Sequence, residues 1–177
     1  GVFYSGESYV VHLSYASHGS SRHALFEWHG HRGVGAQRQA AGRRLSELDG
    51  MSCGGLAART CLVQGQEPDG FIALFGGKMV VREGGVGAAS HDDVCDARDV
   101  NSVGLFHVAG AGNDGDGADP SAAHAVQIAE AASSLQSNQC FVLQTSGALL
   151  VWHGSLTSSE SHAVAMGVAE AMATQLA

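Results

Sequence analysis

Hydrophobic and polar positions alternate in short runs along this chain, a pattern typical of β-strands. In the first half, runs at residues 8–15 and 23–28 predict two strands, and the polar residues 16–22 between them predict a loop. The runs CLVQG and KMVVRE predict two more strands, with the short segment EPDGFIALFGG between them. The second half repeats the pattern with VGLFHVAG, HAVQIAE, QCFVLQT and ALLVWHG. The chain is therefore predicted to be rich in short strands.

Two segments instead have helical character. Residues 35–48 follow a glycine-rich turn and predict a long helix. Residues 158–176 predict a second long helix, preceded by Thr157 and Glu160 at the spacing of a capping box. Its apolar side chains fall on one stripe, at Ala165, Val168, Met172 and Leu176. Each half of the chain thus contains one long helix. In the first half further strands follow the helix, and in the second half the helix comes after all the strands.

The tripeptide Trp-His-Gly occurs twice and uses both tryptophans, Trp28 and Trp152. In each copy a strand candidate precedes it, at residues 7–13 and 139–145, and a long helix candidate follows it. This order predicts an internal repeat of one supersecondary unit. We expect each Trp to seal a sheet against the helix and each Gly to permit a sharp exit from the strand.

One composition shift divides the chain. Residues 83–99, EGGVGAASHDDVCDARD, are rich in Gly, Ala and Asp and have no apolar period, which is typical of an inter-domain connection. The sequence accordingly predicts a first repeat at residues 1–85, a linker at 86–102 and a second repeat at 103–177.

Charge and cysteine content exclude several classes of protein. With 177 residues and a formal net charge of −8, the chain lacks the basic surplus of proteins that bind nucleic acid or anionic lipid non-specifically. It has no long apolar run and no signal-peptide pattern, so we expect a cytoplasmic protein without a membrane span. The four cysteines form no C-x-x-C pair and are expected to be free, buried thiols.

The order of these motifs resembles a gelsolin/villin repeat. The resemblance begins at FYSGESYVV and continues through Trp-His-Gly, the long helix and VQGQEPDGFIALFGGKMVVREGG. The phrases at residues 64–68 and 74–78, together with LFHV, resemble the fourth and fifth repeats of six-repeat proteins. The resemblance implies an α+β fold of two gelsolin-like repeats, each a mixed sheet of five to six strands between one long and one short helix. It also implies that the first strand of the first repeat and the C-terminal part of the second are missing.

For function, the resemblance implies a non-catalytic actin-binding protein of the cytoskeleton that caps, severs or bundles filaments. Calcium usually regulates such proteins and phosphoinositides oppose them. Expected partners are actin and other gelsolin-like repeats of the same full-length chain. Three arginines, Arg38, Arg43 and Arg44, form the candidate headgroup site, which is a small cluster for a lipid surface.

The resemblance also implies calcium ligands, because each repeat of the family holds Ca²⁺ with carbonyl and carboxylate oxygens. In the first repeat the matching residues are Gly6, Glu7, Gln37 and Val86. Glu7 replaces an Asp and Gln37 replaces a Glu, so this site is expected to be degraded. In the second repeat the strand residues are Asn138 and Gln139, and Ser161 replaces the helix Glu. Glu160 is one residue away, about 100° around the helix. Calcium binding is expected to be weak in the first repeat and lost in the second.

The actin contact implied by the resemblance lies on the first long helix. There Gly42, Arg43 and Arg44 replace an apolar stretch of the family, and Arg38 and Leu48 complete the expected contact. The arginines could pair with the acidic surface of actin or form an ordinary solvated helix face. Asp49 matches a family residue that reaches an ion shared with actin, although an Asp after a helix is more often solvated.

Two alternatives stay open. A gelsolin-fold interaction or scaffold domain that no longer binds actin accounts equally well for the charged helix and the degraded ion sites. A metal enzyme built on His29 and His31 is the weaker alternative, because no carboxylate or cysteine completes the pattern. The acidic loop at residues 113–119 matches only the start of an EF-hand loop. No nucleophile elbow or phosphate loop is present, so we expect no enzymatic activity.

Overall fold

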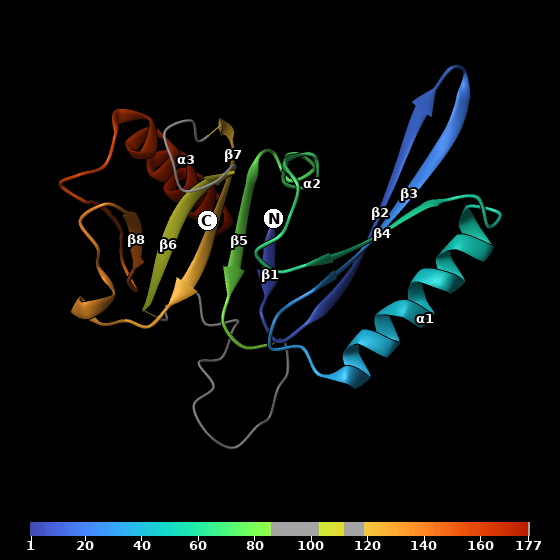
Figure 1. Ribbon diagram of the computed structural model, residues 1–177, viewed down its shortest axis with the longest axis horizontal. Coiled ribbons are helices and arrows are strands. Elements are labelled where there is room, and N and C mark those ends of the chain that lie inside the picture. Colours follow the sequence, from blue (N-terminus) through green and yellow to red (C-terminus); the bar gives the residue numbers. More distant parts are fainter. Residues whose placement is uncertain (86–102, 112–118, 177) are drawn as a thin grey trace. The chain divides into compact units, whose positions relative to one another are not determined.

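The computed structural model describes residues 1–85, 103–111 and 119–176 and shows an α+β protein with a six-stranded and a three-stranded sheet (Figure 1). The chain divides into two compact units, Tyr4–Glu67 and the combination of Gly1–Phe3 with Pro68–Ala177. The predicted linker at residues 86–102 lies outside the described residues, as does nearly all of the acidic loop at 113–119. The repeat boundaries therefore stay a prediction, and the two compact units are described separately.

The unit Tyr4–Glu67 is a three-stranded sheet with one long helix. Its elements are β2 (Ser8–Ser17), β3 (Ser20–His29), α1 (Gly35–Ser52) and β4 (Ala58–Val63). Strands β2 and β3 are antiparallel, whereas β3 and β4 are parallel, so α1 is the crossover that parallel pairing requires. In Figure 1, α1 lies alongside these three strands.

The loop predicted at residues 16–22 is wrong, because the chain forms a tight hairpin there. The β2–β3 pairing continues to Ser17 and Ser20, which leaves only His18 and Gly19 in the turn. Both turn residues have positive φ angles, 48° and 76°, as in a two-residue type I′ hairpin. Polar, solvent-exposed residues therefore form strand in this part of the hairpin.

A small apolar core joins α1 to the hairpin. Leu25, Leu45 and Cys53 are buried together, and Val10, Leu48 and Ala57 pack against them. Leu45 and Leu48 come from α1, and Leu25 comes from the central strand β3. Packing at a few positions, rather than a continuous apolar stripe, thus holds α1 on the sheet.

The other unit is built on the six-stranded sheet, in the order β1-β5-β7-β6-β8-β9. Its strands are β1 (Val2–Tyr4), β5 (Lys78–Arg82), β6 (Gly104–Ala111), β7 (Asp119–Ile128), β8 (Cys140–Gln144) and β9 (Leu149–His153). Its helices are α2 (Asp69–Ala73), the 3₁₀ turn η1 (Ala132–Ser134) and α3 (Ser159–Leu176).

This sheet combines strands from both predicted repeats. Strand β5 pairs in parallel with β7, Lys78–Val81 lying opposite Ala123–Val126, and β1 lies on its other side. The central residues of β5, Met79, Val80 and Val81, are all buried, as expected for a strand covered on both faces. Strand β5 thus has a neighbour on each edge as well as buried side chains, and the described strands of residues 1–85 fall into two sheets.

The six-stranded sheet lies between a long and a short helix, as predicted for a single repeat. Val80 and Phe106 belong to the core under α3, together with Val164, Val168 and Met172 of that helix. Side chains alternate along a strand, so Phe3 faces away from this core while its neighbour Val2 packs against it. The Phe3 ring lies 6.1 Å from the Phe71 ring of α2, which places α2 on the opposite face.

The repeated Trp-His-Gly segments have matching geometry. Trp28 lies opposite Tyr9 in one hairpin and Trp152 opposite Phe141 in the other, with ring centroids 5.7 and 5.5 Å apart. The Gly30 amide donates to the Glu7 carbonyl, and the Gly154 amide donates to the Gln139 carbonyl. A Cβ at either glycine would collide with backbone atoms, of Ser5 or of Ser137. The internal repeat is therefore present in three dimensions.

The two tryptophans nevertheless differ in burial, and the expected sealing role is wrong for both. Leu25 and Val151 lie on the sheet faces that the long helices cover, and side chains alternate along a strand, so Trp28 and Trp152 point to the opposite faces. Trp28 is fully buried, and its indole N–H donates to the Glu67 carboxylate at 2.7 Å. Trp152 is 37% exposed. The cause is strand order, because β3 is flanked by β2 and β4 whereas β9 is the last strand of its sheet.

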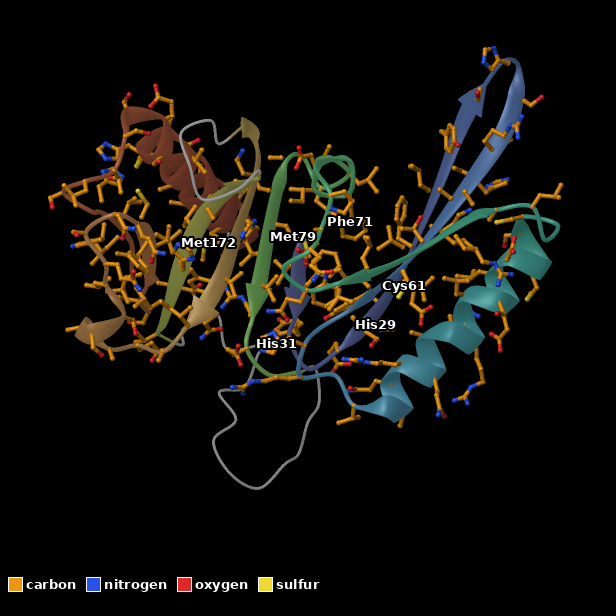
Figure 2. All side chains as sticks on the ribbon, in the orientation of Figure 1. His29, His31, Cys61, Phe71, Met79 and Met172 are labelled. Atoms are coloured by element: carbon orange, nitrogen blue, oxygen red, sulfur yellow. The ribbon has the colours of Figure 1, made fainter. Side chains whose placement is uncertain are left out.

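The cysteines that the structure describes are free thiols. Cys53 and Cys140 are free and buried as predicted, whereas Cys61 on β4 is free but exposed (Figure 2). Cys95 lies outside the described residues.

Among the helices that the structure describes, none combines the length and the apolar character needed to span a membrane.

Candidate functional site

A groove between β2 and α1 brings together some of the residues predicted for calcium and actin in the first repeat, namely Glu7, Gln37, Arg44 and Leu48. It has a volume of about 550 Å³ and lies wholly within the unit Tyr4–Glu67. Strand residues Glu7–Val10 line one side, and helix residues line the other, at Gln37, Ala40, Ala41, Arg44 and Leu48. We call this feature the β2–α1 groove.

Gln37 and Glu7 meet at one end of the groove. The Gln37 side-chain carbonyl accepts the Val34 backbone N–H at 3.0 Å, which helps to begin α1. Its amide nitrogen donates to the Glu7 carboxylate at 3.3 Å. The two residues predicted as ion ligands are thus adjacent, but a neutral amide donates to the Glu7 carboxylate where a second carboxylate would share a cation.

These residues do not fit a calcium site well. Ca²⁺ takes six to eight oxygen ligands, several of them charged. Glu7 is the one carboxylate among Gly6, Glu7 and Gln37, and one of its oxygens already accepts the Gln37 amide. Gly6 lies in the turn before β2, and Val86 lies outside the described residues. The described ligand set is therefore short of charge and of oxygen atoms.

The second predicted ion position is poorer still. Asn138 is exposed and Gln139 half-buried, and both carry neutral amides. The Gln139 carbonyl is occupied by the Gly154 amide at 3.0 Å. The Ser161 hydroxyl lies 3.3 Å from the Ser158 hydroxyl at the start of α3. No carboxylate stands at these three positions.

Glu160, one residue before the predicted ligand position Ser161, is held by hydrogen bonds within the first turn of α3. Hydrogen bonds from its own backbone N–H and from the Ser158 and Ser159 hydroxyls hold the pKa of Glu160 below its usual value. The capping residue is Ser158, whose hydroxyl accepts the Ser161 N–H, so the cap lies one residue after the predicted Thr157. Thr157 instead donates to the Gly154 carbonyl.

The three arginines of the predicted actin contact are all exposed but do not share one face. Successive helix residues are about 100° apart, so Arg38 and Arg43 are separated by about 140°. Arg44 borders the β2–α1 groove, and its guanidinium lies 3.3 Å from the Glu47 carboxylate. Exposed pairs of this kind contribute little stability. Arg44 is therefore the arginine placed to act together with the groove.

Leu48 and Asp49 are less accessible than the sequence suggested. Leu48 is half-buried and packs on the Leu25 cluster while lining the groove. Asp49 is 1% exposed, and its carboxylate accepts hydrogen bonds from the Ala57 N–H at 3.1 Å and the Arg59 guanidinium at 2.9 and 2.5 Å. These bonds, that of Arg59 foremost, lower the pKa of Asp49. Arg59 was not predicted as a partner, because its position on β4 could not be paired with Asp49 without the fold.

His29 and His31 do not converge. His29 is buried, with Nδ1 at 2.9 Å from the Ser8 hydroxyl and Nε2 at 3.3 Å from the Glu27 carboxylate. His31 is exposed, and its backbone N–H donates to the Gln64 side chain. Figure 2 shows both side chains near the exit of β3. His29 is therefore a buried residue, and of the two histidines only His31 lies at the surface.

Comparisons with known proteins identify relatives over nearly the whole chain. It is 34% identical over 173 residues to a cytoplasmic gelsolin of Homarus americanus, covering 96% of this chain and 22% of the relative. Villin-1 of Oryza sativa is 32% identical over 165 residues, covering 90% of this chain and 18% of the relative. Advillin of Mus musculus is 30% identical over 165 residues, covering 93% of this chain and 19% of the relative. No protein-family model matches the chain.

These matches place the chain in the gelsolin/villin family. The chain spans about a fifth of the length of these relatives. A solved complex of Thorarchaeota 2DGel3 with rabbit actin aligns with 99% of this chain and 78% of its own, at 18% identity and a TM-score of 0.35.

Proposed function

We propose that this chain is an actin-binding segment of a gelsolin/villin-type protein, with no catalytic activity of its own. The observation that carries the proposal is sequence similarity to gelsolin and villins over 90% or more of the chain. Capping, severing or bundling would belong to the longer protein of which such a segment is a part, working with further gelsolin-like repeats in the cytoplasm and the cytoskeleton.

Within this proposal, the contact surface is the β2–α1 groove with the adjoining face of α1. Arg44 and Leu48 line the groove, and Arg43 follows about 100° around the helix on the exposed side. An exposed arginine beside a partly apolar groove is suited to an acidic partner, because the guanidinium forms bidentate pairs while the groove accepts an apolar anchor. Asp49 is buried and has a structural role here, and neither Arg38 nor Arg43 lines the groove itself.

The proposal includes only weak calcium control. Its support is the hydrogen bond from the Gln37 amide to the Glu7 carboxylate, which joins the two sides of the groove without a cation. Binding to actin should therefore be nearly the same in millimolar Ca²⁺ and in a chelator. Phosphoinositides are proposed as weak competitors, since they would use the same exposed arginines.

Co-sedimentation with filamentous actin tests the proposal. Arg44→Glu should weaken binding by roughly five- to tenfold, the range of an interface residue worth more than about 1 kcal/mol. Arg22→Glu is the matched control, because Arg22 is an exposed arginine on the hairpin of the same unit and outside the groove. Equal weakening by both variants would move the contact away from the groove.

The scaffold alternative keeps a specific observation in its favour. The groove is bordered by the charged side chains of Arg44 and Glu7, where the resemblance to the family implies an apolar contact on this helix. A domain that no longer binds actin predicts no pelleting of the wild-type chain with or without calcium. In that outcome the fold and family would stand and the partner would be a different acidic surface.

A further inference from the structure

Two histidines and one cysteine converge at the far end of the helix, outside the groove. His12 of β2 and His23 of β3 lie on the sheet face that carries Leu25, and Cys53 caps the C-terminal end of α1. The His12 Nε2 atom is 3.1 Å from His23 Nδ1 and 3.6 Å from Cys53 Sγ. One donor atom from each of the three residues lies within 4.8 Å of the other two.

These separations fit a tetrahedral zinc-class ion. Metal–nitrogen bonds of about 2.0–2.1 Å and metal–sulfur bonds of about 2.3 Å, at tetrahedral angles, place two nitrogens about 3.3 Å apart and a nitrogen and a sulfur about 3.6 Å apart. The two observed distances from His12 are close to these values. The edge between His23 and Cys53 needs at most a small side-chain adjustment. Two imidazoles and a thiolate also form a donor set suited to zinc and similar transition metals, whereas calcium and magnesium prefer oxygen donors.

The local backbone fixes the cysteine in place. Its N–H donates to the Asp49 carbonyl at 3.0 Å, and the left-handed residues Gly54 and Gly55 end the helix immediately after it. Cys53 is 7% exposed, whereas His12 is exposed and His23 half-buried. The cluster thus has a rigid inner ligand, two ligands on a paired hairpin and an open side toward solvent for a fourth ligand.

We propose that His12, His23 and Cys53 bind a divalent transition metal of the zinc class, with water as the fourth ligand. The ion would fasten the β2–β3 hairpin to the C-terminal end of α1. This inference does not depend on actin binding. Burial, and secondarily Asp49, raises the pKa of the Cys53 thiol, so the metal-free protein keeps its S–H and metal binding releases that proton to solvent.

In the metal-free protein the same atoms form an ordinary hydrogen-bonded chain. The Ser14 hydroxyl lies 2.7 Å from His23 Nδ1, which in turn contacts His12. If these hydrogen bonds were the only role of the three residues, the protein would be equally stable without metal and the cluster would bind no metal ion. The test must therefore detect a metal–sulfur bond rather than a change in stability alone.

Titration of the reduced full chain with Co²⁺ supplies that test. Tetrahedral thiolate coordination gives a sulfur-to-cobalt charge-transfer band together with intense visible bands, and both should saturate at one equivalent and disappear when Zn²⁺ is added. Cys53→Ser should abolish the charge-transfer band. Cys61→Ser, at the exposed cysteine of β4, should leave it unchanged. His12→Ala and His23→Ala should each weaken binding by at least about tenfold, since loss of even a ligand-orienting partner costs 10–100-fold.

Alkylation of the wild-type protein is a second test of metal binding that needs no variant. Zn²⁺ should protect Cys53 from a thiol reagent while Cys61 in the same molecule stays reactive. Absence of a charge-transfer band with excess cobalt, a band that survives Cys53→Ser, or no protection of Cys53 would each overturn the proposal. If Cys53→Ser fails to fold, the cobalt spectrum of the wild type and the alkylation result still decide it.

Discussion

Gly30 and Gly154 stand where the chain leaves a strand and passes against the backbone of a preceding turn. A Cβ at Gly30 would overlap the Ser5 carbonyl, and one at Gly154 the Ser137 carbonyl. We expect Gly30→Ala and Gly154→Ala each to destabilise the protein by about 1–3 kcal/mol, as overpacking does. Gly50 in α1 has open space around it, so Gly50→Ala should instead stabilise by about 0.5–1 kcal/mol. Urea unfolding measures all three, and equal effects would contradict this reasoning.

The side chain at position 37, opposite the Glu7 carboxylate, gives a second prediction at the residue scale. Gln37→Glu would place a second carboxylate opposite Glu7, replacing the amide that now donates to it. Two facing carboxylates favour a hard cation, so Gln37→Glu should gain calcium affinity measurable by calorimetry. Gln39→Glu makes the same change in charge at an exposed site of α1 that does not line the groove. A gain of equal size in both variants would show a general charge effect rather than a rebuilt site.

Residue roles were predictable from the sequence where the cause is local. The strand exits at the two Trp-His-Gly segments and the altered ligands Glu7 and Gln37 are readable from the order of residues alone. Partners brought together by the fold were not, such as Arg59 for Asp49 or Cys53 for His12. Residues 41 positions apart in the chain, as Cys53 and His12 are, carry no shared periodicity.

At the scale of elements, Asp49 links the end of α1 to the start of β4. The Arg59 guanidinium and the Ala57 N–H both bind its carboxylate, and they lower its pKa against the opposing effect of burial. A group with a lowered folded-state pKa stabilises the protein above its unfolded pKa, about 4, and loses this contribution as the pH falls through the folded value.

Asp49→Asn should therefore lower the unfolding midpoint in urea clearly at pH 7, and the difference from wild type should shrink below about pH 4. Glu47→Gln is the control, because it breaks the exposed pair with Arg44 on the same helix and should have little effect at either pH. A difference for Asp49→Asn that stays constant with pH would mean that the charge of Asp49 does not stabilise the end of α1.

Element types were predicted better than element pairing. Apolar alternation located nearly every strand, and an apolar stripe located α3, because burial of one face imposes such patterns. Helix α1 was predicted instead from the glycine-rich turn before it. The outer part of the β2–β3 hairpin was missed, since both faces there are mostly exposed and its polar residues follow no apolar period. The pairing of β5 with β7 was also missed, because parallel partners are remote in the chain and the pattern of β5 specifies burial but no neighbour.

At the scale of the whole molecule, each compact unit has a core of its own. Leu25, Leu45 and Cys53 are buried within Tyr4–Glu67, whereas the core under α3 is built from the six-stranded sheet. The internal repeat in sequence therefore does not coincide with the division into units, since β1, α2 and β5 pack with the later strands. Family similarity predicts the repeated hairpin and helix, but the partition of strands between sheets depends on long-range pairing.

Separate cores predict separate responses to core mutations. In a Trp152→Phe background, Trp28 is the remaining tryptophan, so its fluorescence reports on the unit Tyr4–Glu67. Leu45→Ala and Met172→Ala remove side chains that are 5% and 1% exposed, and each should cost about 2–5 kcal/mol in its own core. Leu45→Ala should lower the urea midpoint detected through Trp28, whereas Met172→Ala should lower only a transition seen by circular dichroism. If Met172→Ala shifts the Trp28 transition as far as Leu45→Ala does, the two cores unfold as one cooperative structure.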